Sequence, residues 1–242
     1  QLTAQELDDN FTALDSSIDS AAGSLLPNNN TWTGTNDFTF GLTSPGAGTN
    51  STRIGSGAGT TTQGDFTVAV GGAAGNNTQG DYSVAVGNSA GQTTQGALSV
   101  AVGQQAGQFS QGISSVAVGI NAGNTSQADS AVAIGSSAGQ TSQGTLSVAI
   151  GRNAGNNTQG TQAVAVGNSA GRTSQDIGAV AVGNEAGSDT QGNSAVAVGN
   201  NAGKTSQGVN AVAIGILAAQ TSQGINSVAV GNAAGYDTQG AN

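Results

Sequence analysis

The chain has 242 residues, of which 41 are glycine; 3% are aromatic, 7% are charged, and cysteine, methionine and histidine are absent. This small number of bulky side chains cannot fill a conventional globular core. Stability must therefore come from many small contacts that repeat regularly, as in solenoids and fibres. The formal net charge of −9 disfavours nucleic acid or an acidic membrane surface as a partner, and no apolar run is long enough for membrane insertion.

Residues 1–22 are expected to form a short amphipathic helix. Its apolar residues follow a 4-3-4 spacing between acidic and polar residues, which is typical of one helical stripe. A helix of this length is marginal alone in water, so the stripe either meets copies of itself in a brief coiled coil or packs onto an upstream domain. The candidate oligomerisation residues are Leu7, Phe11, Leu14 and Ile18.

Residues 23–53 are expected to form a β transition segment between this helix and the rest of the chain. The stretch "NTWTGTNDFTFG" (30–41) alternates polar and apolar residues as a strand does. Pro45 and Gly46 then interrupt the pattern.

Residues 54–242 repeat a unit of 16 residues without insertion or deletion. Counted from glutamine as position 1, the unit reads Gln-Gly-x-x-(Ser/Ala/Thr)-Val-Ala-(Val/Ile)-Gly-x-x-Ala-Gly-x-x-(Thr/Ser). A unit of this length is too short for a helix–turn–helix, and Val-Ala-Val flanked by glycine is typical of β structure. The sequence therefore predicts an all-β fold, a parallel β-solenoid or β-roll with one coil per unit. The glutamines are residues 63, 79, 95, 111, 127, 143, 159, 175, 191, 207, 223 and 239.

The Val-Ala-Val strand is apolar on both faces. Side chains alternate along a strand, so Val84 and Val86 point to one face and Ala85 to the other. A thin coil has only one interior, so the second face needs a partner. A homotrimer is expected, and the alternative is a monomeric solenoid with an exposed apolar strip.

The invariant positions of the repeat are expected to have structural roles. The glycines at positions 9 and 13 suit corners with positive φ or close backbone approach. The glutamines suit an amide ladder along the stack, and the Thr/Ser residues at position 16 suit a similar ladder of hydroxyls. The candidate structural residues are Gln79, Val84, Ala85, Val86, Gly87, Ala90, Gly91, Gln95, Gly151 and Gln159.

No pattern in the sequence points to catalysis or to a metal. Histidine and cysteine are absent, the repeat frames no carboxylate pair, and a narrow solenoid is expected to offer no deep cleft. Calcium-binding β-rolls need aspartate at a fixed place in each turn, whereas here aspartate recurs in no column. We expect no enzymatic activity and no cofactor, and charged residues at the variable positions are expected to face water.

Two stretches carry resemblances to known families. "SVAVG" (83–87), "SVAIG" (147–151) and "NSVAVG" (226–231) resemble the head repeats of trimeric autotransporter adhesins, which form a left-handed parallel β-roll in a tight trimer. This resemblance covers roughly residues 54–242. The unit here is longer by about two residues and adds the Gln-Gly and Ala-Gly elements, so handedness and coil outline do not carry over.

The N-terminal part is similar to bacteriophage tail-fibre proteins, in which a segment like "LTAQELDDNFTALDSSID" (2–19) precedes strands like "NTWTGTNDFTF" (30–40) and a repetitive trimeric shaft. Together the resemblances imply an extracellular tail-fibre shaft of a virion. Such a shaft is joined to other tail or baseplate proteins and positions a distal tip on a host cell-surface receptor. The chain begins at Gln1 without methionine and stops within a unit at Asn242, so it is expected to be a fragment.

Two other functions remain open at this point. A bacterial surface adhesin would carry a secretion signal or an outer-membrane anchor and would lie on the cell surface. An ice-binding solenoid would display two outward threonine columns separated by one inward residue. Here the Thr/Ser residues at position 16 adjoin a partial threonine column at position 15, which Phe109 and Asp189 interrupt.

Overall fold

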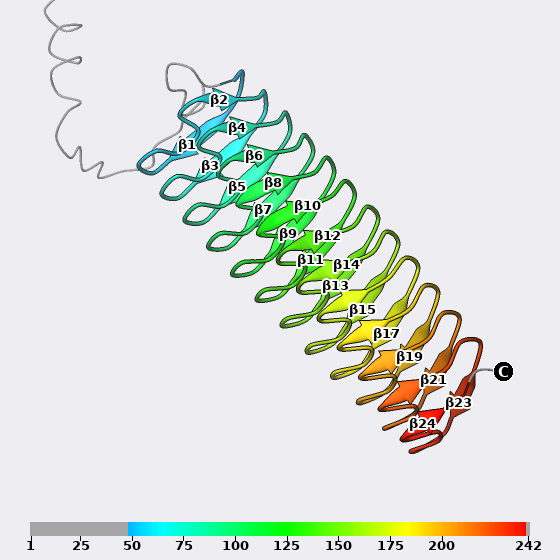
Figure 1. The fold of residues 1–242 in the computed structure, drawn as a ribbon. Coiled ribbons are helices and arrows are strands. Elements are labelled where there is room, and N and C mark those ends of the chain that lie inside the picture. Colours follow the sequence, from blue (N-terminus) through cyan, green and yellow to red (C-terminus); the bar gives the residue numbers. More distant parts are fainter. Residues whose placement is uncertain (1–47, 241–242) are drawn as a thin grey trace, which may run out of the picture. The chain divides into compact units, whose positions relative to one another are not determined.

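The computed structural model describes residues 48–240, which form a stack of coils with two strands in each coil (Figure 1). The predicted helix, with Leu7, Phe11, Leu14 and Ile18, lies outside the described residues. The strands form two parallel 12-stranded sheets. The fold is therefore all-β, a parallel β-solenoid of 16-residue coils, as the repeat predicts.

The odd-numbered strands form one sheet, here called sheet A. They are β1 (Thr52–Ile54), β3 (Val68–Val70), β5 (Val84–Val86), β7 (Val100–Val102), β9 (Val116–Val118), β11 (Val132–Ile134), β13 (Val148–Ile150), β15 (Val164–Val166), β17 (Val180–Val182), β19 (Val196–Val198), β21 (Val212–Ile214) and β23 (Val228–Val230).

The even-numbered strands form the other sheet, here called sheet B. They are β2 (Thr62–Gln63), β4 (Thr78–Gln79), β6 (Thr94–Gln95), β8 (Phe109–Gln111), β10 (Thr125–Gln127), β12 (Ser142–Gln143), β14 (Thr158–Gln159), β16 (Ser174–Gln175), β18 (Thr190–Gln191), β20 (Ser206–Gln207), β22 (Ser222–Gln223) and β24 (Thr238–Gln239).

Equivalent residues of successive units stand in register. Val84 pairs with Val100 and Ala85 with Ala101, and the same offset of one unit holds along both sheets. The first rung starts before the recognisable repeat, because Thr52 of β1 pairs with Val68. A constant period without insertions gives every rung the same neighbours, so each column of the sequence becomes a column in space.

The interior of the coil is built from alanine and glutamine. The central alanine of each sheet A strand from β3 to β21 is fully buried, whereas the two flanking Val or Ile side chains are half-buried or exposed. A second alanine, at position 12, is fully buried from Ala74 to Ala218. Ala85 thus faces the interior and Val84 and Val86 face outward, because the glutamines of sheet B fill much of the interior and leave room only for small side chains from sheet A.

The buried glutamines tie the two sheets together. In β16, Gln175 Nε2 donates to the Val164 carbonyl of β15 across the coil at 2.7 Å and lies 3.1 Å from both the Ala179 carbonyl and Gln191 Oε1. Hydrogen bonds between side-chain amides join successive glutamines from Gln159 to Gln239, each Nε2 donating to the Oε1 of the next coil. The glutamine column is therefore both a ladder along the stack and a crosslink between the sheets.

The Thr/Ser column at position 16 differs from its predicted hydroxyl ladder. Within residues 48–240 these side chains face solvent, apart from a half-buried Ser222, and donate no hydrogen bonds to one another. Equivalent atoms of successive rungs lie about 4.8 Å apart, too far for a direct hydrogen bond between two hydroxyls. An amide spans this distance because its donor and acceptor are different atoms.

Ala219 allows a test of why position 13 is glycine in the other coils. It occupies position 13, where the other coils have glycine, and it has the same left-handed backbone, with φ of +46°. An L-residue in this region costs about 1–2 kcal/mol, so Ala219→Gly should stabilise the protein, by about 0.5–1 kcal/mol once the greater freedom of the unfolded glycine is subtracted.

The matched control is Ala218→Gly, which removes an equally buried methyl group at a residue without positive φ. It should lower the midpoint of thermal unfolding, whereas Ala219→Gly should raise it. A lower midpoint for both variants would contradict the strain assigned to Ala219.

Candidate functional site

The most extensive uniform surface of the described residues is the outward side of sheet A, here called the Val/Ile face. Its side chains flank the buried alanine of each strand from β3 to β23, and none of them is charged or polar. Exposure is substantial even in the middle of the stack, at 38% for Ile150 and 36% for Val182. The face consists of Val68, Val70, Val84, Val86, Val100, Val102, Val116, Val118, Val132, Ile134, Val148, Ile150, Val164, Val166, Val180, Val182, Val196, Val198, Val212, Ile214, Val228 and Val230.

Parallel stacking makes the Val/Ile face continuous. The strands of sheet A lie side by side along the whole stack (Figure 1). With a strand spacing of about 4.8 Å and three residues per strand, the strip is about 50 Å long and about 10 Å wide. A strip of about 500 Å² is comparable with the largest apolar patches of monomeric proteins, which are often functional.

The corner before each sheet A strand, formed by positions 3 and 4, carries large exposed side chains. The rings of Phe66 and Tyr82 stack with centroids 5.1 Å apart and planes 5° apart. They are 47% and 58% exposed. Stacked in this way, the two rings cover each other's faces, so they extend the apolar surface more than they offer a free ring face to a ligand.

Aspartates at position 3 accept hydrogen bonds from backbone N–H groups of the preceding coil. Asp81 Oδ1 accepts a hydrogen bond from the Asp65 backbone N–H at 2.9 Å, and Asp129 Oδ1 accepts one from Ile113 N–H at 2.8 Å. These N–H groups point along the stack, where a short carboxylate of the next coil can reach them. The aspartates are therefore structural acceptors and form no acidic cluster.

The corner after each sheet A strand, formed by positions 10 and 11, is mostly polar. Position 10 holds Asn, Gln, Ser, Gly or Arg in most described coils, but isoleucine at Ile120 and Ile216. These two side chains are 53% and 57% exposed.

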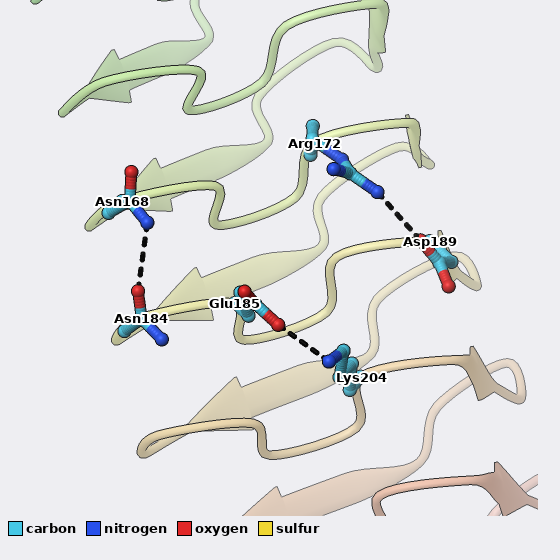
Figure 2. A network of polar contacts seen from close by, with 6 residues as sticks. All are labelled: Asn168, Arg172, Asn184, Glu185, Asp189 and Lys204. Carbon is cyan, nitrogen blue, oxygen red and sulfur yellow. Dashed lines mark hydrogen bonds and ion pairs between the residues drawn. The ribbon is translucent and has the colours of Figure 1, made fainter.

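Most of the charged side chains outside position 3 lie on neighbouring coils in the C-terminal half of the stack (Figure 2). Lys204 Nζ lies 2.6 Å from Glu185 Oε2, and Arg172 pairs with Asp189 at 3.4 Å. The members of both pairs are 33–49% exposed at the side chain, where an ion pair contributes about 0–1 kcal/mol. Asn168 Nδ2 donates to Asn184 Oδ1 beside them at 2.9 Å. The pairs link successive coils, and within each pair the two charges compensate each other.

The outward side of sheet B presents hydroxyls to solvent. The position 16 side chains form an exposed column from Thr62 to Thr238, interrupted only by half-buried Ser222. The neighbouring position 15 is also outward, so Thr125 and Ser126 are both exposed with no inward residue between them. This differs from the spaced threonine pairs of an ice-binding surface, and Phe109 and Asp189 break the second column.

A shallow depression of about 190 Å³ opens on sheet B beside Asp176, which replaces the usual glycine at position 2. Asp176 Oδ1 accepts a hydrogen bond from the Ile177 backbone N–H at 2.8 Å. Asp176 is the one titratable residue among those that line the depression, so the lining holds no acid and base pair. The other lining residues are Thr158, Ser174, Gln175, Thr190, Gln191 and Gly192.

The described residues form neither a metal site nor a membrane-spanning helix. Among residues 48–240, no three acidic side chains come together as a metal site would require. The same part of the chain has no helix that could cross a membrane.

The predicted structural residues belong to several coils and fall into four classes: buried glutamine, buried alanine, outward valine and glycine with positive φ. Gln79 and Gln95 are buried in sheet B, and Ala90 is buried opposite Ala85 of β5. The remaining residues behave as their columns do: Gln159 begins the continuous run of the ladder, Val84 and Val86 belong to the Val/Ile face, and Gly87, Gly91 and Gly151 have positive φ. The residues at positions 3, 4, 10 and 11 vary from unit to unit, so the repeat pattern alone gives no reason to group them as a surface.

Comparison of the chain with models of protein families, with curated proteins and with solved structures found no match, so the function has to be inferred from the surfaces described above.

Proposed function

We propose that this chain forms the shaft of a homotrimeric virion fibre, the tail fibre of a tailed phage, which extends from the particle and positions a receptor-binding tip at the host cell surface. The observation that carries the proposal is the uncovered Val/Ile face. It runs through every rung from β3 to β23 without a polar side chain.

A closed ring of copies accounts for this face. Rotation about an axis parallel to the stack brings the same strip of every copy to the centre. The Val/Ile faces of the copies then cover one another. Removal of apolar surface from water contributes about 25 cal/mol per Å², so a strip of hundreds of Å² supplies a large driving force. The resemblance of the Ser-Val-Ala-Val-Gly motif to trimeric adhesin repeats favours three copies.

A stacked solenoid suits a spacer. Each coil contacts only the coils next to it, so length is added without a larger core, and twelve rungs span about 55 Å. Two ion pairs, an aspartate that accepts from the backbone and a stacked pair of rings link successive coils of the rod. In this proposal the shaft performs no catalysis, and tail or baseplate proteins hold one end of the fibre.

A bacterial surface adhesin would use the same trimeric rod, because the repeats resemble those of adhesin heads. Immunogold electron microscopy with antibodies raised against residues 48–240 separates the two. Labelling of phage tails is expected, whereas labelling of uninfected cells would overturn the virion assignment in favour of the adhesin.

The trimer itself is tested by the mass of the purified chain in solution. Multi-angle light scattering should give three times the 23.0 kDa of the chain. A stable monomer would remove the basis of the proposal.

Ile150→Asp should dissociate the trimer or weaken it by at least about ten-fold, because three carboxylates would be brought together, desolvated, near one axis. Ile150 is 38% exposed in the single chain, so the monomer should stay folded. Thr158→Asp is the matched control, since it adds the same charge on the exposed side of sheet B. A trimer that tolerates both changes equally would show that the Val/Ile face is not the interface.

A further inference from the structure

The two corners of each coil border the Val/Ile face on opposite sides. Positions 3 and 4, here called the first corner, precede the sheet A strand, and positions 10 and 11, here called the second corner, follow it. The corners form the two edges of the stack on either side of that strip (Figure 1). In a ring of identical copies with the strip at the centre, the first corner of one copy is the part nearest to the second corner of the next.

We propose that these corners pack against each other coil on coil, so that the first corner of each unit contacts the second corner of the same unit in the neighbouring copy. The proposal rests on the trimeric shaft proposed above and adds the register between its copies. The partner of the corner residues is a second copy of this chain.

The size of the interface requires the corners. A strip of about 500 Å² shared between two neighbours gives each pair of copies only about 250 Å² per partner, whereas a stable interface buries about 800 Å² per partner. Adding the mostly exposed residues at positions 3, 4 and 10 of each coil brings the contact toward that size. The strip alone falls short of the usual area of a stable interface, and the corners supply the rest.

The placement of large aliphatic side chains in the corners points to the same pairing. Position 10 is large and aliphatic only at Ile120 and Ile216 among the described coils, and in both units position 3 is also large and aliphatic, at Ile113 and Val209. Ile113 is 52% exposed and Ile120 is 53% exposed. Within one chain they lie on opposite sides of the sheet A strand, so packing inside the chain gives no reason for them to occur together.

Symmetry restricts the register to two choices. A closed ring permits no shift along its axis, and position 10 follows position 3 by less than half a coil, or about 2 Å of rise. A first corner can therefore meet the second corner of its own unit number or that of the preceding unit. Pairing with the preceding unit would place Ile113 against Gln104 and Asp129 against Ile120, and of the two position 10 isoleucines only Ile216 would meet an aliphatic residue, Ile225. Pairing within the same unit number places Ile113 on Ile120 and Asp129 beside Ser136.

The absence of native cysteine makes this register directly testable. The full chain carrying Ile113→Cys and Ile120→Cys should form a covalent trimer on mild oxidation, because each copy is then linked to both neighbours. The trimer should run as one band without reductant and return to single chains with it. The control carries Ile113→Cys and Gln104→Cys, which tests the preceding unit one rung away. A disulfide needs Cα atoms about 4.4–6.8 Å apart and Cβ atoms directed toward each other, so this control should give less covalent trimer if corners of the same unit number are in contact.

The outcomes separate this inference from the proposed function. A trimeric mass by light scattering with no covalent trimer, or with more of it in the Gln104 variant, would overturn the register but leave the shaft. A monomeric mass would overturn the shaft as well. A second pair, Val209→Cys with Ile216→Cys, repeats the test in another coil should the first variant fold poorly, and a disulfide confined to single chains in either pair would contradict the placement of the corners.

Discussion

Gly151→Val is expected to unfold its own coil and to lower the free energy of unfolding by at least about 4 kcal/mol. Gly151 has φ of +125°, in a region that β-branched residues do not adopt. A Cβ atom there would lie 2.5 Å from the Gly167 carbonyl oxygen of the next rung. This oxygen belongs to the backbone of a stacked coil, so it cannot move aside without separating the two rungs.

The measurement is denaturant unfolding combined with amide hydrogen exchange. Protection should fall in the rungs around β13 and survive toward the ends of the stack, because repeat proteins lose stability locally. Arg152→Ala is the control at the next residue. Its exposed side chain makes a 3.1 Å hydrogen bond to Asn168 Oδ1, so its removal should change stability by less than about 0.5 kcal/mol. Equal stability of the two variants would refute the requirement for glycine at position 9.

Gln175→Leu is the second change with a large expected effect, a loss of about 3–5 kcal/mol at nearly constant side-chain volume. It removes the 2.7 Å bond to the Val164 carbonyl, which joins sheet B to sheet A. It also leaves Gln191 Oε1 without its donor, whereas Gln159 Nε2 keeps its hydrogen bonds to the Val148 and Ala163 carbonyls. Buried polar groups left without partners cost about 1–3 kcal/mol each.

Gln95→Leu is the matched comparison, because Gln95 sits in the same column outside the continuous part of the ladder. Its Nε2 donates to the Val84 carbonyl at 2.8 Å, while its Oε1 is buried without a hydrogen-bond partner. The difference in unfolding free energy between the two variants measures the ladder, and Gln175→Leu should cost about 1–2 kcal/mol more. Equal losses would mean that the glutamines act only as links across the coil.

In the proposed fibre, the two sides of the sheet A strand have different roles. Alanines and glutamines stabilise each chain from within, and the Val/Ile face is the surface proposed to contact the partner copies. Variants of the interior should therefore change the stability of the single chain, whereas variants such as Ile150→Asp should change its assembly. Measuring unfolding and mass on the same proteins distinguishes the two effects.

The sequence by itself determined the period, the parallel in-register pairing and the all-β class. A 16-residue unit without insertions stacks every residue on its own equivalent, and Val-Ala-Val between glycines permits little besides a short strand. The glutamine ladder also followed from the sequence, because an invariant amide in a stacked column has an amide above and below it.

Only the tertiary structure decided which side of the strand is the interior. Val84, Ala85 and Val86 are all apolar, so their pattern is equally consistent with either side inward. The choice depends on the distance between the sheets, which accommodates Ala85 and a glutamine that reaches the opposite strand, and leaves no room for two valines. The same geometry places variable positions on the two borders of the Val/Ile face, and the alignment of repeats could not show that Ile113 and Ile120 lie on either side of one exposed strip.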